Sequence, residues 1–195
     1  MILELSNNVK IRKARLTDEQ IIEELKQGRT DSFKELILRY EPRIASTVIG
    51  MLGQCAEAED VGQETFVRFY RNIHNFRKEA GVGTYLTRIA INLSINELRR
   101  RKRKSALFVR NNDVVLQKPD ANEPLNFDRD EWVQRAIDRL EPKFKAVVVL
   151  RLIDGFSTEE TAKILGIPLG TVLSRLSRAQ QKLQKILKPL IKDGV

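Results

Sequence analysis

Two carboxylates and an amide near residue 60 are the first side chains in this sequence that could act on a substrate or bind a partner. Asp60, Gln63 and Glu64 stand three and four residues apart, so a helix would present them on one face. Paired carboxylates can work as general acid and base, but no histidine, nucleophilic cysteine or glycine-rich phosphate loop converges on them. Such a face could instead dock against a basic protein surface.

Metal and disulfide chemistry is not indicated. The chain has one cysteine, Cys55, and one histidine, His74, which together cannot build a zinc site of the usual Cys/His kind. A single cysteine cannot form an internal disulfide, and it fits a reducing cytoplasm. We therefore expect no metal, no cofactor and no small-molecule substrate, and we predict that the protein is not an enzyme.

The overall charge favours a polyanionic partner. The formal net charge is +9 and the isoelectric point is near 9.8, which suits either nucleic acid or an acidic membrane surface. No apolar run approaches the roughly 18 residues that a bilayer-spanning helix needs. Residues 1–8 lack a basic segment followed by an apolar core, so no signal peptide is expected. We predict a cytoplasmic protein without membrane insertion.

One predicted helix, over about residues 84–104, carries a polar face along its whole length. Spacings of three and four residues bring together Arg88, Asn92, Asn96, Arg99 and Arg103. Residues 99–104 are all basic, which could match the dipole at a helix C-terminus or form a solvated tail. Because the face continues towards Tyr85, we favour a track for nucleic-acid phosphates.

Aromatic residues gather near this basic face, as in proteins that stack unpaired bases. They are Phe66, Tyr70, Phe76 and Tyr85. Aromatic side chains more often belong to the core, and we expect that of Phe66 and Phe69. Phe76 and Tyr85 flank a glycine-containing loop and are the better candidates for base contact.

The C-terminal part of the sequence follows the pattern of a helix-turn-helix. Ser157 and Glu160 have the spacing of a capping box, Gly166 lies at a turn, and a long helix starts near Leu169. The outer face of that helix is predicted to carry short hydroxyls and basic groups suited to base edges and phosphates: Thr171, Ser174, Arg175, Arg178 and Lys182. A solvated charged face is the commoner meaning of a basic helix, but the combination of cap, turn and basic side favours DNA binding.

Helix punctuation throughout the chain predicts an all-α fold of two small helical domains. Thr17 and Gly28 should bound the first helix, and Pro42 should kink or split the second. Turn and linker residues interrupt the periodicity after Ser105. We divide the chain into an N-terminal tail (1–17), a first domain (18–104), a flexible linker (105–127) and a helix-turn-helix domain (128–195).

Several of these stretches resemble the extracytoplasmic-function (ECF) sigma factors, which belong to the sigma-70 family of bacterial RNA polymerase initiation factors. Residues 60–66 (DVGQETF) resemble a signature in region 2 of that family. Residues 76–77, 84–92 and 98–100 are similar to its promoter-melting and minus-ten-reading helices. Residues 140–175 are similar to its region 4. The resemblance spans about residues 18–187.

This resemblance implies a transcription initiation factor that binds core RNA polymerase and directs it to promoter DNA. The residues implied to dock on the polymerase are Asp60, Gln63, Glu64 and Phe66. Those implied to hold and melt the minus-ten element are Phe76, Arg77, Tyr85, Arg88, Asn92, Asn96, Arg99, Arg100 and Arg103. Those implied to read the minus-thirty-five element are Thr171, Ser174, Arg175, Arg178 and Lys182. Many family members also bind an anti-sigma factor, which we expect as a further partner.

Three positions depart from the family pattern. Asn96 replaces a frequent Asp, and Leu173 stands where Lys or Arg is common, so both bear on which promoter is recognised. Gly62 is predicted to lie within a helix, at a cost of about 1 kcal/mol relative to Ala.

Rival interpretations explain less of the sequence. A repressor or activator that binds duplex DNA without polymerase would leave the face around Asp60 and the helix over 84–104 without a role. A basic RNA-binding or membrane-surface protein would need apolar helix faces that two cores already require. A nucleic-acid-processing enzyme would need a metal or nucleophile constellation, and none is evident.

Overall fold

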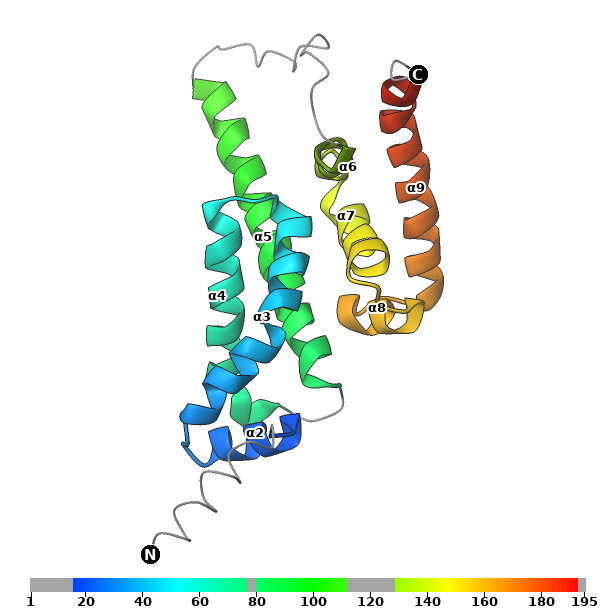
Figure 1. The fold of residues 1–195 in the computed structure, drawn as a ribbon. Helices are drawn as coiled ribbons and strands as arrows, with labels where there is room; N and C mark the ends of the chain where they lie inside the picture. The colour runs from blue at the N-terminus through cyan, green and yellow to red at the C-terminus, as the bar shows by residue number, and fades with distance from the viewer. Residues whose placement is uncertain (1–15, 77–79, 112–128, 193–195) are drawn as a thin grey trace, which may run out of the picture.

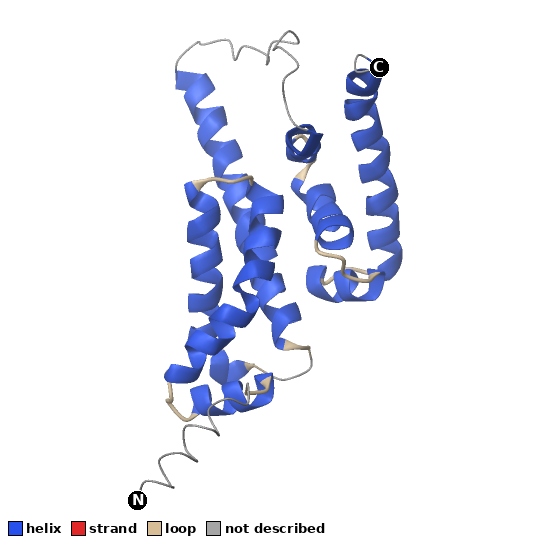
Figure 2. Ribbon diagram, viewed as in Figure 1, coloured by secondary structure: helices blue, strands red, loops and turns tan. Residues whose placement is uncertain are grey.

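The computed structural model describes residues 16–76, 80–111 and 129–192. All regular secondary structure in these ranges is helical, in agreement with the all-α prediction (Figures 1 and 2). Among the described residues, no helix combines the length and the apolarity that crossing a bilayer requires.

The N-terminal lobe is built around three long helices that pack against one another. These are α3 (Asp31–Leu52), α4 (Ala56–Arg71) and α5 (Val82–Asn111), with the short α2 (Asp18–Lys26) and the 3-10 turn η1 (Ile73–Asn75) at one end (Figure 1). Thr17 caps α2, as predicted, and Gln20 completes a capping box with it. Gly28, with φ of 82°, ends that helix in the left-handed region that glycine tolerates best.

One predicted helix end was wrong, and Pro42 does not split its helix. Helix α3 runs through Pro42 without being split, because apolar residues on both sides of the proline, including Leu36 and Ile44, are buried in the same core. Helix α5 continues past Lys104 to Asn111. Arg101, within the basic stretch, is bonded to the end of α3 and the start of α4, which local sequence does not reveal.

The C-terminal lobe holds the predicted helix-turn-helix. It consists of α6 (Arg129–Asp138), α7 (Pro142–Val148), the π-helical turn η2 (Val149–Ile153), α8 (Thr158–Leu165) and α9 (Leu169–Lys192). Ser157 and Glu160 form the expected capping box at the start of α8. Gly166, with φ of 63°, turns the chain towards α9. Helix α9 packs against α6, α7 and α8, which fixes the side that it turns outward.

One hydrophobic cluster extends through both lobes. Ala146, Val149 and Leu150 of the C-terminal lobe are buried together with the core of α3, α4 and α5. At Gly50 of α3, a Cβ atom would lie 3.1 and 3.2 Å from the γ carbons of Val149. The missing side chain therefore allows the two lobes to approach closely.

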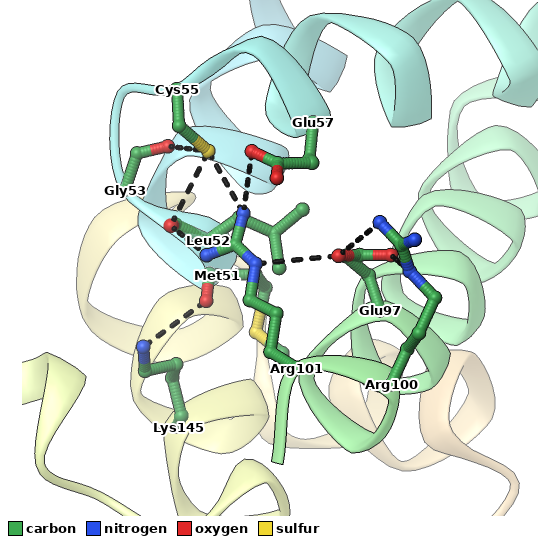
Figure 3. A network of polar contacts seen from close by, with 9 residues as sticks. All are labelled: Met51, Leu52, Gly53, Cys55, Glu57, Glu97, Arg100, Arg101 and Lys145. Atoms are coloured by element: carbon green, nitrogen blue, oxygen red, sulfur yellow. Dashed lines mark hydrogen bonds and ion pairs between the residues drawn. The ribbon is translucent and has the colours of Figure 1, made fainter. Parts of the chain in front are cut away.

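Polar contacts surround this apolar junction. The buried Lys145 donates from Nζ to the carbonyl oxygen of Met51 at 3.1 Å (Figure 3). It also donates to Asp138 Oδ1 at 2.8 Å. Asp154 accepts hydrogen bonds from Thr47 Oγ1 at 2.7 Å and Ser46 Oγ at 3.0 Å. Burial raises the pKa of the Asp154 carboxyl, against the effect of these hydrogen bonds. The lobes are thus joined by both packing and directed bonds.

Substituting Gly50 tests whether its small size holds the lobes together. We expect Gly50→Leu to separate them, because the new side chain would collide with Val149, while helix propensity at this position improves by about 0.5–1 kcal/mol. The radius of gyration from small-angle X-ray scattering should rise, with helix content by circular dichroism retained. Gly62→Leu is the matched control, because a Cβ at Gly62 meets no atom within 4 Å. An unchanged radius for Gly50→Leu would contradict the role assigned to this contact.

Candidate docking and nucleic-acid interfaces

The predicted docking face lies on α4. Asp60 and Gln63 are exposed there, and Glu64 is half-buried. Glu64 accepts a hydrogen bond from Arg68 Nε at 2.7 Å, one turn further along the helix. Part of its charge is therefore balanced within α4, and Asp60 is the more exposed of the two carboxylates.

An apolar groove of about 550 Å³ runs beside this face, between α3 and α4. Its apolar lining includes Phe33, Ile37, Ile44, Ile49, Ala58, Phe66 and Val67. Glu41, Glu59 and Gln63 contribute polar groups to the same groove. Phe66 is only 7% exposed, so its ring does not protrude from the surface. A partner could contact the ring only from within the groove. Gly62 also lines the groove, and a Cβ atom at this position would meet no other atom within 4 Å.

Arg101 fixes α4, the helix that carries the predicted docking face, relative to α5. Its guanidinium donates to the Leu52 carbonyl at 3.1 Å, to Cys55 Sγ at 3.0 Å and to Glu57 Oε2 at 3.2 Å (Figure 3). It also reaches Glu97 Oε1 at 3.3 Å. One side chain of α5 therefore connects the end of α3 with the start of α4.

Glu97 also forms an ion pair with Arg100, one of the residues predicted to bind DNA. Arg100 Nε lies 2.6 Å from Glu97 Oε2. This hydrogen bond lowers the pKa of the Glu97 carboxyl, burial opposes it, and Arg101 adds to the lowering. Arg100 is therefore engaged in an ion pair, in contrast to a basic residue that faces solvent alone.

The remaining polar face of α5 is arranged as the helical spacing predicts. Its exposed members are Asn92, Asn96, Arg99 and Arg103. Arg88, at the other end of the face, is half-buried and donates to the Lys163 carbonyl oxygen of α8. One end of the face is thus covered by the C-terminal lobe.

The predicted aromatic contacts divide into two kinds. Tyr85 is half-buried, with its ring 5.9 Å from that of Phe69 and 5.2 Å from that of Phe76. Phe76 is only 6% exposed, because its ring packs against that of Phe69 in the core. The ring is therefore not available as a surface on which a base could stack. Arg77 lies outside the described residues. His74 is exposed.

In α9, the predicted DNA contacts are not equally exposed. Ser174, Arg178 and Lys182 are exposed, whereas Thr171 and Arg175 are half-buried. The buried Val172 and Ala179 fix this orientation. Leu173, already noted as a departure from the family pattern, is also exposed, and so is Ser177, which the grouping by basic residues overlooked. The position of Ser177, on the side of the helix away from Val172 and Ala179, was the signal that could have identified it.

Lys182 has a structural partner. Its Nζ lies 2.7 Å from Glu141 Oε1 and 4.6 Å from the centre of the Phe144 ring. Hydrogen bonds from Lys182 and Lys143 lower the pKa of Glu141 to about 2. The ammonium group therefore fastens α9 to the start of α7, which limits its availability for DNA.

Comparison with known proteins identifies both lobes. The family model for Sigma-70 region 2 matches residues 36–104, and that for Sigma-70, region 4 matches residues 130–183. The chain is 30% identical to the RNA polymerase sigma-H factor of Pseudomonas aeruginosa, over 91% of this chain and 97% of that protein. It is 32% identical to the ECF RNA polymerase sigma factor SigW of Bacillus subtilis, over 87% and 96% respectively.

Solved structures show the same fold. The sigma factor RpoE of Bartonella quintana, in complex with the anti-sigma factor NepR, superposes with a TM-score of 0.63 at 27% identity, covering 82% of this chain and 98% of that one. CnrH, in complex with the cytosolic domain of CnrY, superposes with a TM-score of 0.64 at 23% identity, covering 87% and 96%. Two family regions in their proper order, together with relatives that match nearly end to end, show that this chain belongs to the ECF sigma factors, the promoter-directing initiation factors of bacterial RNA polymerase.

Proposed function

We propose that this sigma factor binds core polymerase through α4 and the α3–α4 groove, holds the minus-ten element on α5, and reads the minus-thirty-five element with α9. The observation that supports this division most strongly is the separation of chemistries on the surface. An apolar groove with acidic residues lies between α3 and α4, whereas amide, hydroxyl and guanidinium groups are exposed on α5 and α9. Each surface suits a different partner.

The polymerase contact combines charge with apolar burial. Asp60 and Gln63 would meet basic groups of the partner, and the adjacent groove would accept its apolar side chains. Phe66 would contribute from inside the groove. This arrangement gives the charges a role in orientation and the groove a role in affinity.

The minus-ten contact would follow the exposed part of α5. Arg99 and Arg103 can bind phosphates, and Asn92 and Asn96 can hydrogen-bond to bases or backbone. Burial divides the aromatic residues near this surface: Tyr85 borders it, while Phe76 supports it from the core. Holding a base that has left the stack offsets the unstacking cost of a few kcal/mol.

Both promoter contacts require the lobes to move apart. The two elements are centred about 25 base pairs apart, or about 85 Å at 3.4 Å per base pair. Helices α5 and α8 touch in the present structure, and Arg88 is bonded to the α8 backbone. We therefore propose that this closed arrangement is not the promoter-bound one.

Further properties follow from the family. Its members act on polymerase and DNA by binding, so we propose that this chain is not itself an enzyme and that it works in the cytoplasm, where both partners are found. The Bartonella quintana relative was solved with an anti-sigma factor, and we propose a regulator of that kind for this chain.

Run-off transcription tests the proposed function directly. The purified chain would be added to core RNA polymerase with a pool of promoter fragments from the source genome. Discrete transcripts that need both proteins are expected. The absence of transcripts, together with no co-elution with core enzyme, would refute polymerase-dependent initiation.

The docking face is tested by reversing one charge. Asp60→Lys should weaken the association with core polymerase by about tenfold or more, equivalent to about 1.4 kcal/mol, because it places like charges in contact. The dissociation constant can be measured by fluorescence anisotropy. Glu19→Lys on α2 is the control, since it makes the same charge change at another exposed position. Equal affinities of the two variants would remove Asp60 from the interface.

Two basic residues of α9 should differ in their effect. Arg178→Ala should reduce the slope of log affinity against log salt concentration by about one phosphate contact, or roughly 0.9. Lys182→Ala should change that slope less, because its ammonium already binds Glu141 and Phe144, and should lower the thermal midpoint instead. Promoter binding by the holoenzyme, measured across a salt series, separates the two. Identical slopes for both variants would contradict this assignment.

A further inference from the structure

The outward side of the recognition helix contains an apolar residue that the DNA-binding role so far leaves unused. Val172 and Ala179 are completely buried, which turns the opposite side of α9 to solvent. Leu173 lies at the edge of that outward side, about 100° around the helix from Val172, and is 50% exposed. Leu169, one turn earlier, is 42% exposed. Neither leucine is among the residues that form the core of this lobe.

The neighbours of Leu173 are those of a surface that approaches DNA closely. Ser174, the next residue, and Ser177, one turn further along, are short and exposed, and the exposed Arg178 lies on the far edge of the outward side. Gly170 has no side chain, and the space around it is open. Small residues around a leucine let it extend furthest from the helix, towards the floor of a groove.

The chemistry of the major groove limits what a leucine can do there. It cannot pair with a phosphate or hydrogen-bond to a base edge. The apolar group that B-DNA exposes in the major groove is the C5-methyl group of thymine. We infer that Leu173 is a specificity-determining residue whose isobutyl group packs against a thymine methyl in the minus-thirty-five element.

This inference rests on the proposed placement of α9 in the major groove and adds a base preference to it. A contact with another protein is the alternative use of an exposed leucine. The serine and glycine neighbours, with Arg178 further along the outward side, favour DNA, because a protein interface would centre on a larger apolar patch. The assigned ligand is therefore a thymine on either strand of the duplex.

Two experiments test the inference: selection of promoter sequences, and replacement of the selected thymine by deoxyuridine. Holoenzyme would select promoter fragments with a randomised upstream element, using the wild-type chain, Leu173→Ala and Leu152→Ala. Leu152 is the matched control, a leucine on η2 that is 54% exposed but lies outside α9. Wild type and Leu152→Ala should enrich thymine at a position where Leu173→Ala does not. Circular dichroism would verify that each variant folds.

Deoxyuridine then removes only the methyl group while preserving base pairing. Replacing the enriched thymine should weaken binding of the wild type by about fourfold, the effect expected for one methyl group leaving an apolar contact. It should leave the binding of Leu173→Ala unchanged.

Wild type that binds thymine and deoxyuridine equally at every enriched position would overturn the inference, while the proposed function would stand. Leu173→Ala that selects the same sequence but loses affinity for core polymerase would also overturn it, in favour of a protein contact. A holoenzyme that enriches no sequence at all would overturn the proposed function together with the inference.

Discussion

The C-terminal end of α3 is the point on which the rest of the arrangement depends. The last carbonyl groups of a helix have no partner within it and must be satisfied from elsewhere. Here Arg101 of α5 donates to the Leu52 carbonyl, and Lys145 of α7 donates to the Met51 carbonyl (Figure 3). The end of α3 is therefore bonded both to α5 within its own lobe and to α7 of the C-terminal lobe.

These two cations differ in what they would lose if the lobes separated. Arg101 would keep its bonds to Leu52, Glu57 and Glu97, because all of them lie in the same lobe. Lys145 would keep Asp138 but exchange the Met51 carbonyl for water. Hydration of the ammonium would offset that loss, so the closed arrangement can open without leaving a buried charge unpaired. The opposing cost is the exposure of the apolar surface around Val149 and Leu150.

The basic residues of the chain therefore divide according to their partners. Arg101, Lys145 and Lys182 hold helices together through carbonyls, carboxylates or an aromatic ring. Arg99, Arg103 and Arg178 are exposed on the helices proposed to bind DNA. Net charge alone would assign both groups to the nucleic acid, whereas the contacts show that the first group is engaged within the protein.

Local sequence determined the helical elements, the capping boxes at Thr17 and Ser157, the turn at Gly166 and the family motifs, because each depends on residues within one or two helical turns. It also identified the faces of α4 and α5 from spacing alone. The tertiary structure decided that Phe76 belongs to the core, that Lys182 binds Glu141, and that Leu173 faces outward. It also decided that the lobes meet at Gly50. These outcomes depend on contacts between distant segments, whose geometry is set by packing that no local pattern encodes.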